Sequence, residues 1–82
     1  MKKILYFSAP WCGHCKMLGP IMDKLSSDLP ITKINVDNDT NNSVKYGVRS
    51  VPTLVLVDQT GKELNRLVGY VSENQVKQFY NG

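Results

Sequence analysis

Cys12 and Cys15 are the two residues of this 82-residue chain whose type and spacing can do chemistry. They lie where an apolar run ends and a helical pattern begins, in the segment WCGHCK at residues 11–16. Only a thiolate attacks a disulfide, and the free N–H groups of a helix N-terminus favour an anion. Residues three apart on a helix share a face, so this pair can form a disulfide. We therefore expect Cys12 to attack and Cys15, one turn inside the helix, to resolve the mixed disulfide.

Two residues separate the cysteines. Gly13 is expected to let the backbone turn tightly between them. The imidazolium form of His14 would add positive charge beside Cys12, which favours the thiolate and makes the disulfide form more oxidising. The alternative is that His14 is an exposed loop histidine with no role.

A zinc site is the main alternative for the cysteine pair. Structural zinc normally takes four ligands, and the chain offers two Cys and one His, with His14 between the cysteines. A second alternative is two unrelated buried cysteines. A disulfide between Cys12 and Cys15 closes too small a loop to add stability, and a secreted disulfide scaffold would carry more cysteines. We therefore expect no metal and no cofactor, only a redox-active Cys12–Cys15 disulfide.

The elements that must position this pair follow from the apolar pattern. Residues 3–7, which are apolar after Lys3, and residues 54–57 are runs typical of buried strands. Residues 31–36 alternate, and residues 63–68 form a strand after a turn at Gly61. One helix is expected from Cys12 to Pro30 with Pro20 inside it, a short one through Val44–Tyr46 before Gly47, and a last one after a Ser72/Gln75 capping box. This order predicts an α/β fold in one domain, residues 1–82, with a four-stranded mixed sheet and helices on both faces.

Composition and charge exclude several classes of partner. The chain has 41% hydrophobic residues and a net charge of +3, and its ten Lys and Arg are scattered, so we expect no nucleic-acid partner. The apolar run after Met1 is shorter than the core of a secretory signal, and no stretch is long enough to span a membrane. We expect a cytoplasmic monomer with no membrane partner.

The sequence resembles the thioredoxin family over nearly its whole length. The resemblance is carried by FSAPWCGHCK at residues 7–16, Pro20, INVD at 34–37, YGVRSVPTL at 46–54, GKE at 61–63 and Val68-Gly69. It implies a thioredoxin fold and thiol–disulfide exchange, with Trp11, Val51, Pro52 and Gly69 around the cysteines. It also implies a cis Val51–Pro52 bond, whose loop would offer the Val51 backbone to an extended substrate chain and keep metals from the thiols. The alternative is an ordinary trans proline that opens a strand.

The chain departs from the family in two respects. Thioredoxins usually carry a buried Asp six residues before the first cysteine, where this chain has Tyr6, while the family's Lys is kept as Lys33. Without that Asp, Lys33 should be less deeply buried, and the Cys15 proton would leave through water or the Tyr6 hydroxyl. Thioredoxins also usually begin with a further strand and helix, so this is a minimal form of glutaredoxin size. It lacks glutaredoxin's Pro-Tyr and Gly-Gly, and its Gly-His loop resembles that of protein disulfide isomerase domains.

We expect from this resemblance a dithiol reductase of protein disulfides, recharged by a flavin-dependent thioredoxin reductase or by a glutaredoxin-type system. His14 favours an alternative, a disulfide oxidase or isomerase. The absence of a signal peptide argues against that alternative, because oxidative folding occurs outside the cytosol. A third possibility is a thioredoxin-like binding subunit that does no redox chemistry.

Overall fold

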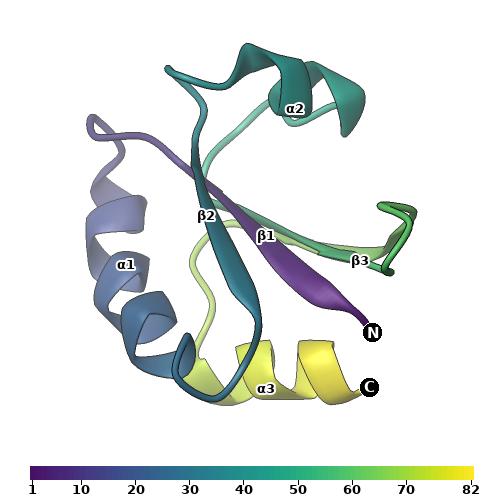
Figure 1. Ribbon diagram of the computed structural model, residues 1–82. Coiled ribbons are helices and arrows are strands. Elements are labelled where there is room, and N and C mark those ends of the chain that lie inside the picture. Colours follow the sequence, from purple (N-terminus) through teal and green to yellow (C-terminus); the bar gives the residue numbers. More distant parts are fainter.

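Seven elements follow one another in the computed structural model, which describes residues 1–82. They are β1 (Lys3–Ser8), α1 (Gly13–Leu25), β2 (Ile31–Asn35), α2 (Thr40–Lys45), β3 (Thr53–Val57), β4 (Glu63–Val68) and α3 (Glu73–Asn81) (Figure 1). The predicted order of elements is confirmed.

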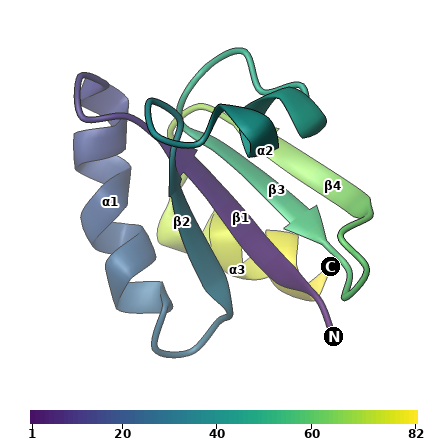
Figure 2. The same ribbon diagram turned by 45° about the horizontal axis from the view of Figure 1, so that its top comes forward.

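The strands form one mixed sheet in the order β2-β1-β3-β4. β1 pairs parallel with β2 and antiparallel with β3, and β3 and β4 form an antiparallel hairpin. The carboxyl ends of β1 and β2 and the amino end of β3 therefore lie at the same edge of the sheet (Figure 2). This topology brings the cysteine motif, the loop after β2 and the Val51–Pro52 loop together.

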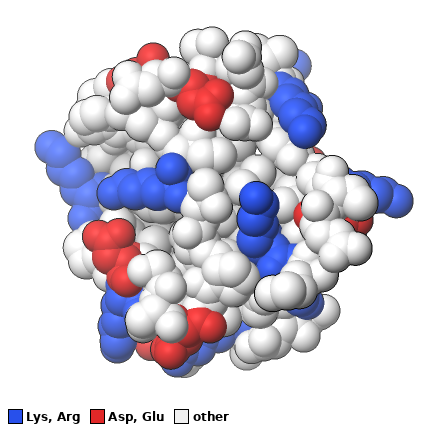
Figure 3. Space-filling view, viewed as in Figure 1, with Lys and Arg blue, Asp and Glu red and all other residues white.

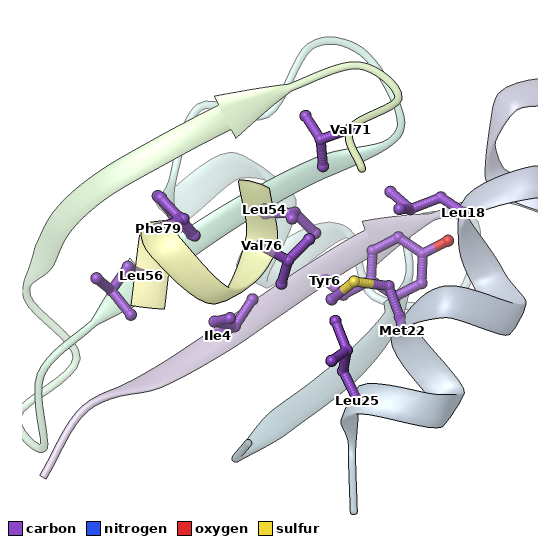
Figure 4. Close-up of a cluster of buried hydrophobic side chains, with 10 residues drawn as sticks. All are labelled: Ile4, Tyr6, Leu18, Met22, Leu25, Leu54, Leu56, Val71, Val76 and Phe79. Carbon is purple, nitrogen blue, oxygen red and sulfur yellow. The ribbon is translucent and has the colours of Figure 1, made fainter. Parts of the chain in front are cut away.

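Helices cover both faces of the sheet, as predicted. On one face, α1 and α3 pack over β1 and β3 through ten buried side chains, drawn in Figure 4 (Ile4, Tyr6, Leu18, Met22, Leu25, Leu54, Leu56, Val71, Val76 and Phe79). On the other face, alternate residues of the strands, including Phe7 and Val55, form a smaller cluster with Tyr46 and Val48 beside α2. Successive strand side chains point to opposite faces, so β1 and β3 are buried on both.

Helix α1 is shorter than predicted. It ends at Leu25 and does not run to Pro30. The hydroxyls of Ser26 and Ser27 donate to the carbonyls of Asp23 and Lys24, which offers the backbone an alternative to further helix. The helical spacing of apolar residues in the sequence continues to Leu29, but the two successive serines end the helix before that residue.

Helix α2 begins earlier than predicted, at Thr40. The Asp39 carboxylate caps it by accepting the Asn42 N–H at 3.1 Å. Gly47 follows it with φ +63°, which confirms the predicted stop. The Ser72/Gln75 capping box of α3 is also confirmed.

Charged side chains are mixed on the surface. Figure 3 shows Lys and Arg spread among Asp and Glu over the face in view, without a continuous basic stripe. None of the three helices has the length and apolar character needed to cross a membrane.

Candidate active site

Cys12 is the N-cap residue of α1. Its backbone is extended (φ −88°, ψ 117°), and its Sγ accepts a hydrogen bond from the Cys15 N–H at 3.2 Å. The sulfur therefore takes the place that a Ser or Asp oxygen takes in an ordinary N-cap, at the positive end of the helix dipole. The same sulfur lies 3.5 Å from the Val51 carbonyl oxygen, to which its thiol donates.

Cys15 lies one turn inside the helix, and both cysteines are free. The two side chains pack with Ala9 in a small cluster bordered by Val36 and Val51. Burial raises the pKa of the Cys15 thiol to about 11, and its hydrogen bond with Cys12 adds to the rise. Cys15 is thus held as a thiol near neutral pH, whereas the Cys12 sulfur faces the helix N-terminus.

The Val51–Pro52 peptide bond is cis, as the resemblance implied, and the loop lies against the cysteines. The Pro52 carbonyl accepts the Gly69 N–H at 2.8 Å, and Gly69 has φ +91°, a conformation that glycine adopts without strain. These contacts bring Val51, Pro52 and Gly69 to the side of Cys12. Residues from three distant parts of the sequence therefore meet at one edge of the sheet.

Trp11 is 68% exposed beside the cysteines. Its indole N–H donates to both carboxylate oxygens of Asp37, at 3.2 and 3.1 Å. Asp37 was not among the residues predicted for the site. The signal for it is topological, because Asp37 follows β2 just as the cysteine motif follows β1, and parallel neighbours end at the same edge.

Gly13 and His14 form the exposed start of α1. The predicted tight turn at Gly13 is wrong, because this glycine is the first helical residue and does not have a positive φ. A Cβ at Gly13 would meet nothing within 4 Å. His14 is exposed between the two cysteines, close to the helix end where the Cys12 sulfur lies.

Tyr6 lies behind Cys15 on β1. It is 1% exposed, and its hydroxyl donates to the backbone carbonyl of Cys15 at 3.3 Å. Burial, together with the nearby Cys15, raises the pKa of Tyr6 to about 12. A hydroxyl that donates to this carbonyl and stays protonated does not favour the predicted route for the Cys15 proton through Tyr6, and that route stays a prediction.

Lys33 stands opposite Tyr6 in the β1–β2 ladder, and its side chain is exposed. The expectation that Lys33 would be less buried without an Asp partner is confirmed. Its positive charge lowers the pKa of Cys15, against the larger effects of burial and of the Cys12 hydrogen bond.

Three comparisons with known proteins agree with this geometry. The family model for thioredoxin matches residues 1–81. The thioredoxin of Haemophilus influenzae is 39% identical over 82 residues, which cover 95% of this chain and 76% of that protein. Thioredoxin 2 of Chlorobaculum tepidum is 39% identical over 74 residues, covering 85% of this chain and 67% of that protein.

Solved structures give the same result. A thioredoxin variant from Halobacterium salinarum superposes with a TM-score of 0.89 at 35% identity, covering 98% of this chain and 72% of that one. The thioredoxin of Fasciola hepatica superposes with a TM-score of 0.87 at 28% identity, covering 98% and 78%. With a matching family model over almost every residue and two cysteines at the start of α1, the chain belongs to the thioredoxin family of thiol–disulfide oxidoreductases.

Proposed function

We propose that this protein reduces disulfides in other proteins by exchange with Cys12 and Cys15. The observation that carries the proposal is the asymmetry of the pair. Both cysteines are buried, but the Cys12 sulfur caps the helix and accepts the Cys15 N–H, whereas the Cys15 thiol lies one turn inside the helix and has a raised pKa. One sulfur is therefore placed to attack as a thiolate and the other to wait as a thiol.

The reaction has two exchange steps. The Cys12 thiolate attacks one sulfur of the substrate disulfide, forms a mixed disulfide, and releases the other substrate sulfur as a thiolate. Cys15 then loses its proton and attacks the Cys12 sulfur, which breaks the mixed disulfide and releases the second substrate thiolate. The two electrons that reduce the substrate come from oxidation of the Cys12–Cys15 dithiol to a disulfide.

The loop around Pro52 supports substrate binding. The Val51 carbonyl faces the Cys12 sulfur, so an extended substrate segment can pair with the Val51 backbone while its disulfide reaches Cys12. Gly69 borders the same place without a side chain, and Trp11 offers an exposed aromatic surface held by Asp37. These residues would bind backbone and apolar groups, which fits a broad range of protein substrates.

His14 and the partner that recharges the protein belong to the same proposal. An imidazolium at His14 would add positive charge near Cys12 and make the disulfide form more oxidising than it would otherwise be. The oxidised pair would be reduced again by a flavin-dependent thioredoxin reductase or by a glutaredoxin-type dithiol.

Turnover against a model protein disulfide tests this function. With dithiothreitol as the reductant, the protein should accelerate the reduction of insulin disulfides, and the double variant Cys12→Ser/Cys15→Ser should give only the rate of dithiothreitol alone. Precipitation of the reduced insulin chains, followed by turbidity, measures the rate. A double variant as active as the parent would show that the cysteines do not carry the reaction.

A further inference from the structure

Cys15 lies on an open groove between α1 and the sheet, and the Val51–Pro52 loop does not line it. The groove has a volume of about 460 Å³ and is bordered by Tyr6 of β1, Lys33 of β2, and Cys15, Gly19 and Asp23 of α1. Cys15, Gly19 and Asp23 are spaced by four residues, so they follow one ridge along the helix. The middle residue of this ridge has no side chain, and a Cβ there would meet nothing within 4 Å.

The reaction proposed above needs a group that takes the proton from Cys15, because burial holds this sulfur as a thiol. The charged and titratable groups that contact the thiol or line its groove come from the helix N-cap, the helix and both neighbouring strands: Cys12, Lys16, Asp23, Tyr6 and Lys33. In the mixed disulfide the Cys12 sulfur is bonded to the substrate. The lysine ammonium groups have only donors, and the Tyr6 hydroxyl already donates to the Cys15 carbonyl. Asp23 is the one carboxylate among these groups.

Pro20 leaves a backbone carbonyl beside the groove without its helical hydrogen bond, and water can bind such a carbonyl. Proline has no N–H, so Pro20 leaves the Lys16 carbonyl without its usual donor four residues on in the helix. Lys16 and Pro20 both border the groove. Eight residues of helix correspond to about 12 Å along the axis, so a proton that moves from Cys15 to Asp23 must cross a short chain of waters.

We propose that Asp23 accepts the Cys15 proton through water in this groove, as Cys15 attacks the mixed disulfide. This inference rests on the proposed function. The proton leaves the Cys15 sulfur for the Asp23 carboxylate, the new Cys12–Cys15 bond forms, and the substrate sulfur departs as a thiolate. Asp23 then returns its proton to the solvent, to which its side chain is exposed.

The test follows the two exchange steps separately with Ellman's reagent in a stopped-flow instrument. The reduced protein releases one coloured thiolate when Cys12 attacks the reagent and a second one when Cys15 resolves the mixed disulfide. A large excess of reagent makes the first phase fast, so the second phase reports Cys15 alone. In Asp23→Asn the first phase should be unchanged, and the second should be slower by about three- to tenfold near neutral pH. This is below the roughly 10²–10⁴ of a general base in direct contact.

The sign of the effect separates proton transfer from simple electrostatics. Removing a negative charge near Cys15 would favour its thiolate and speed the second phase, whereas removing a proton acceptor slows it. The deficit of Asp23→Asn should shrink as the pH approaches about 11, where the Cys15 thiol ionises without help. Asp23→Glu should restore most of the rate, and Asp28→Asn, an exposed carboxylate beyond the helix and away from the groove, should match the parent.

The outcomes distinguish the two proposals. A second phase in Asp23→Asn that is as fast as in the parent, or faster, overturns the role of Asp23 and leaves the reductase intact. Absence of both phases in the parent protein overturns the reductase itself. Thermal unfolding of each variant, expected to match the parent, shows that a slower phase does not come from a damaged fold.

Discussion

Replacing Cys15 by serine is expected to turn the protein from a catalyst into a trap for its substrate. Cys12 keeps its place at the N-cap of α1 and can still attack, but a serine hydroxyl cannot resolve the mixed disulfide. Turnover should fall by about 10³-fold or more, the scale on which loss of a nucleophile acts. Mass spectrometry without reductant should find the substrate joined to Cys12.

Cys12→Ser is the matched control, because it makes the same replacement of sulfur by oxygen at the other cysteine, three residues earlier in the chain. It removes the attacking sulfur and leaves Cys15 buried, with a pKa raised to about 11. This variant should lose turnover to the same extent but form no adduct. An adduct on Cys12→Ser would reverse the roles given to the two cysteines. The absence of an adduct on Cys15→Ser would show that Cys12 does not attack the substrate.

Replacing Tyr6 by aspartate should lower the free energy of unfolding by about 3–5 kcal/mol, a large share of the stability of a small domain. The ring of Tyr6 is 1% exposed and points toward Leu18 and Met22 of α1 in the main core (Figure 4). Aspartate would leave much of this volume empty and would place a carboxyl group where burial opposes its charge. Lys33 is exposed, so it gives such a carboxylate little compensation.

Tyr6→Phe separates the hydroxyl from the ring. It keeps the packing and removes only the bond to the Cys15 carbonyl, so it should cost about 0.5–1.5 kcal/mol. Resolution by Cys15 should keep the parent rate, because the hydroxyl is a donor that stays protonated. Urea unfolding measures both variants. An aspartate variant as stable as Tyr6→Phe would show that the core adapts to a carboxylate at this position.

The sequence was most informative where a pattern repeats or where a residue has few alternatives. Apolar runs gave β1 and β3, the capping box gave α3, and Gly47 and Gly69 marked the ends of α2 and β4. The parallel pairing of β1 and β2 followed from the intervening helix, and it placed the cysteines at the edge where the Pro52 loop also lies.

The features that could not be predicted from the sequence depend on individual side-chain contacts or on the packing of distant elements. The end of α1 is decided by two serine hydroxyls that bond back to the helix, against an apolar pattern that continues to Leu29. The Trp11–Asp37 pair joins residues 26 positions apart, and only the sheet topology makes them neighbours. The groove beside Cys15 also depends on the tertiary arrangement. It forms because the helix ridge that contains Gly19 faces Tyr6 of β1 and Lys33 of β2.

The reduction potential of the Cys12–Cys15 couple tests the central claim most directly. It is measured by equilibrating the protein with glutathione buffers of known ratio and quantifying the free thiols. A protein-disulfide reductase should have a potential more negative than about −200 mV, on the side of thioredoxin at about −270 mV. A less negative value, toward the −180 mV of protein disulfide isomerase or the roughly −120 mV of a strong oxidant, would contradict the claim and assign the protein to disulfide formation or isomerisation.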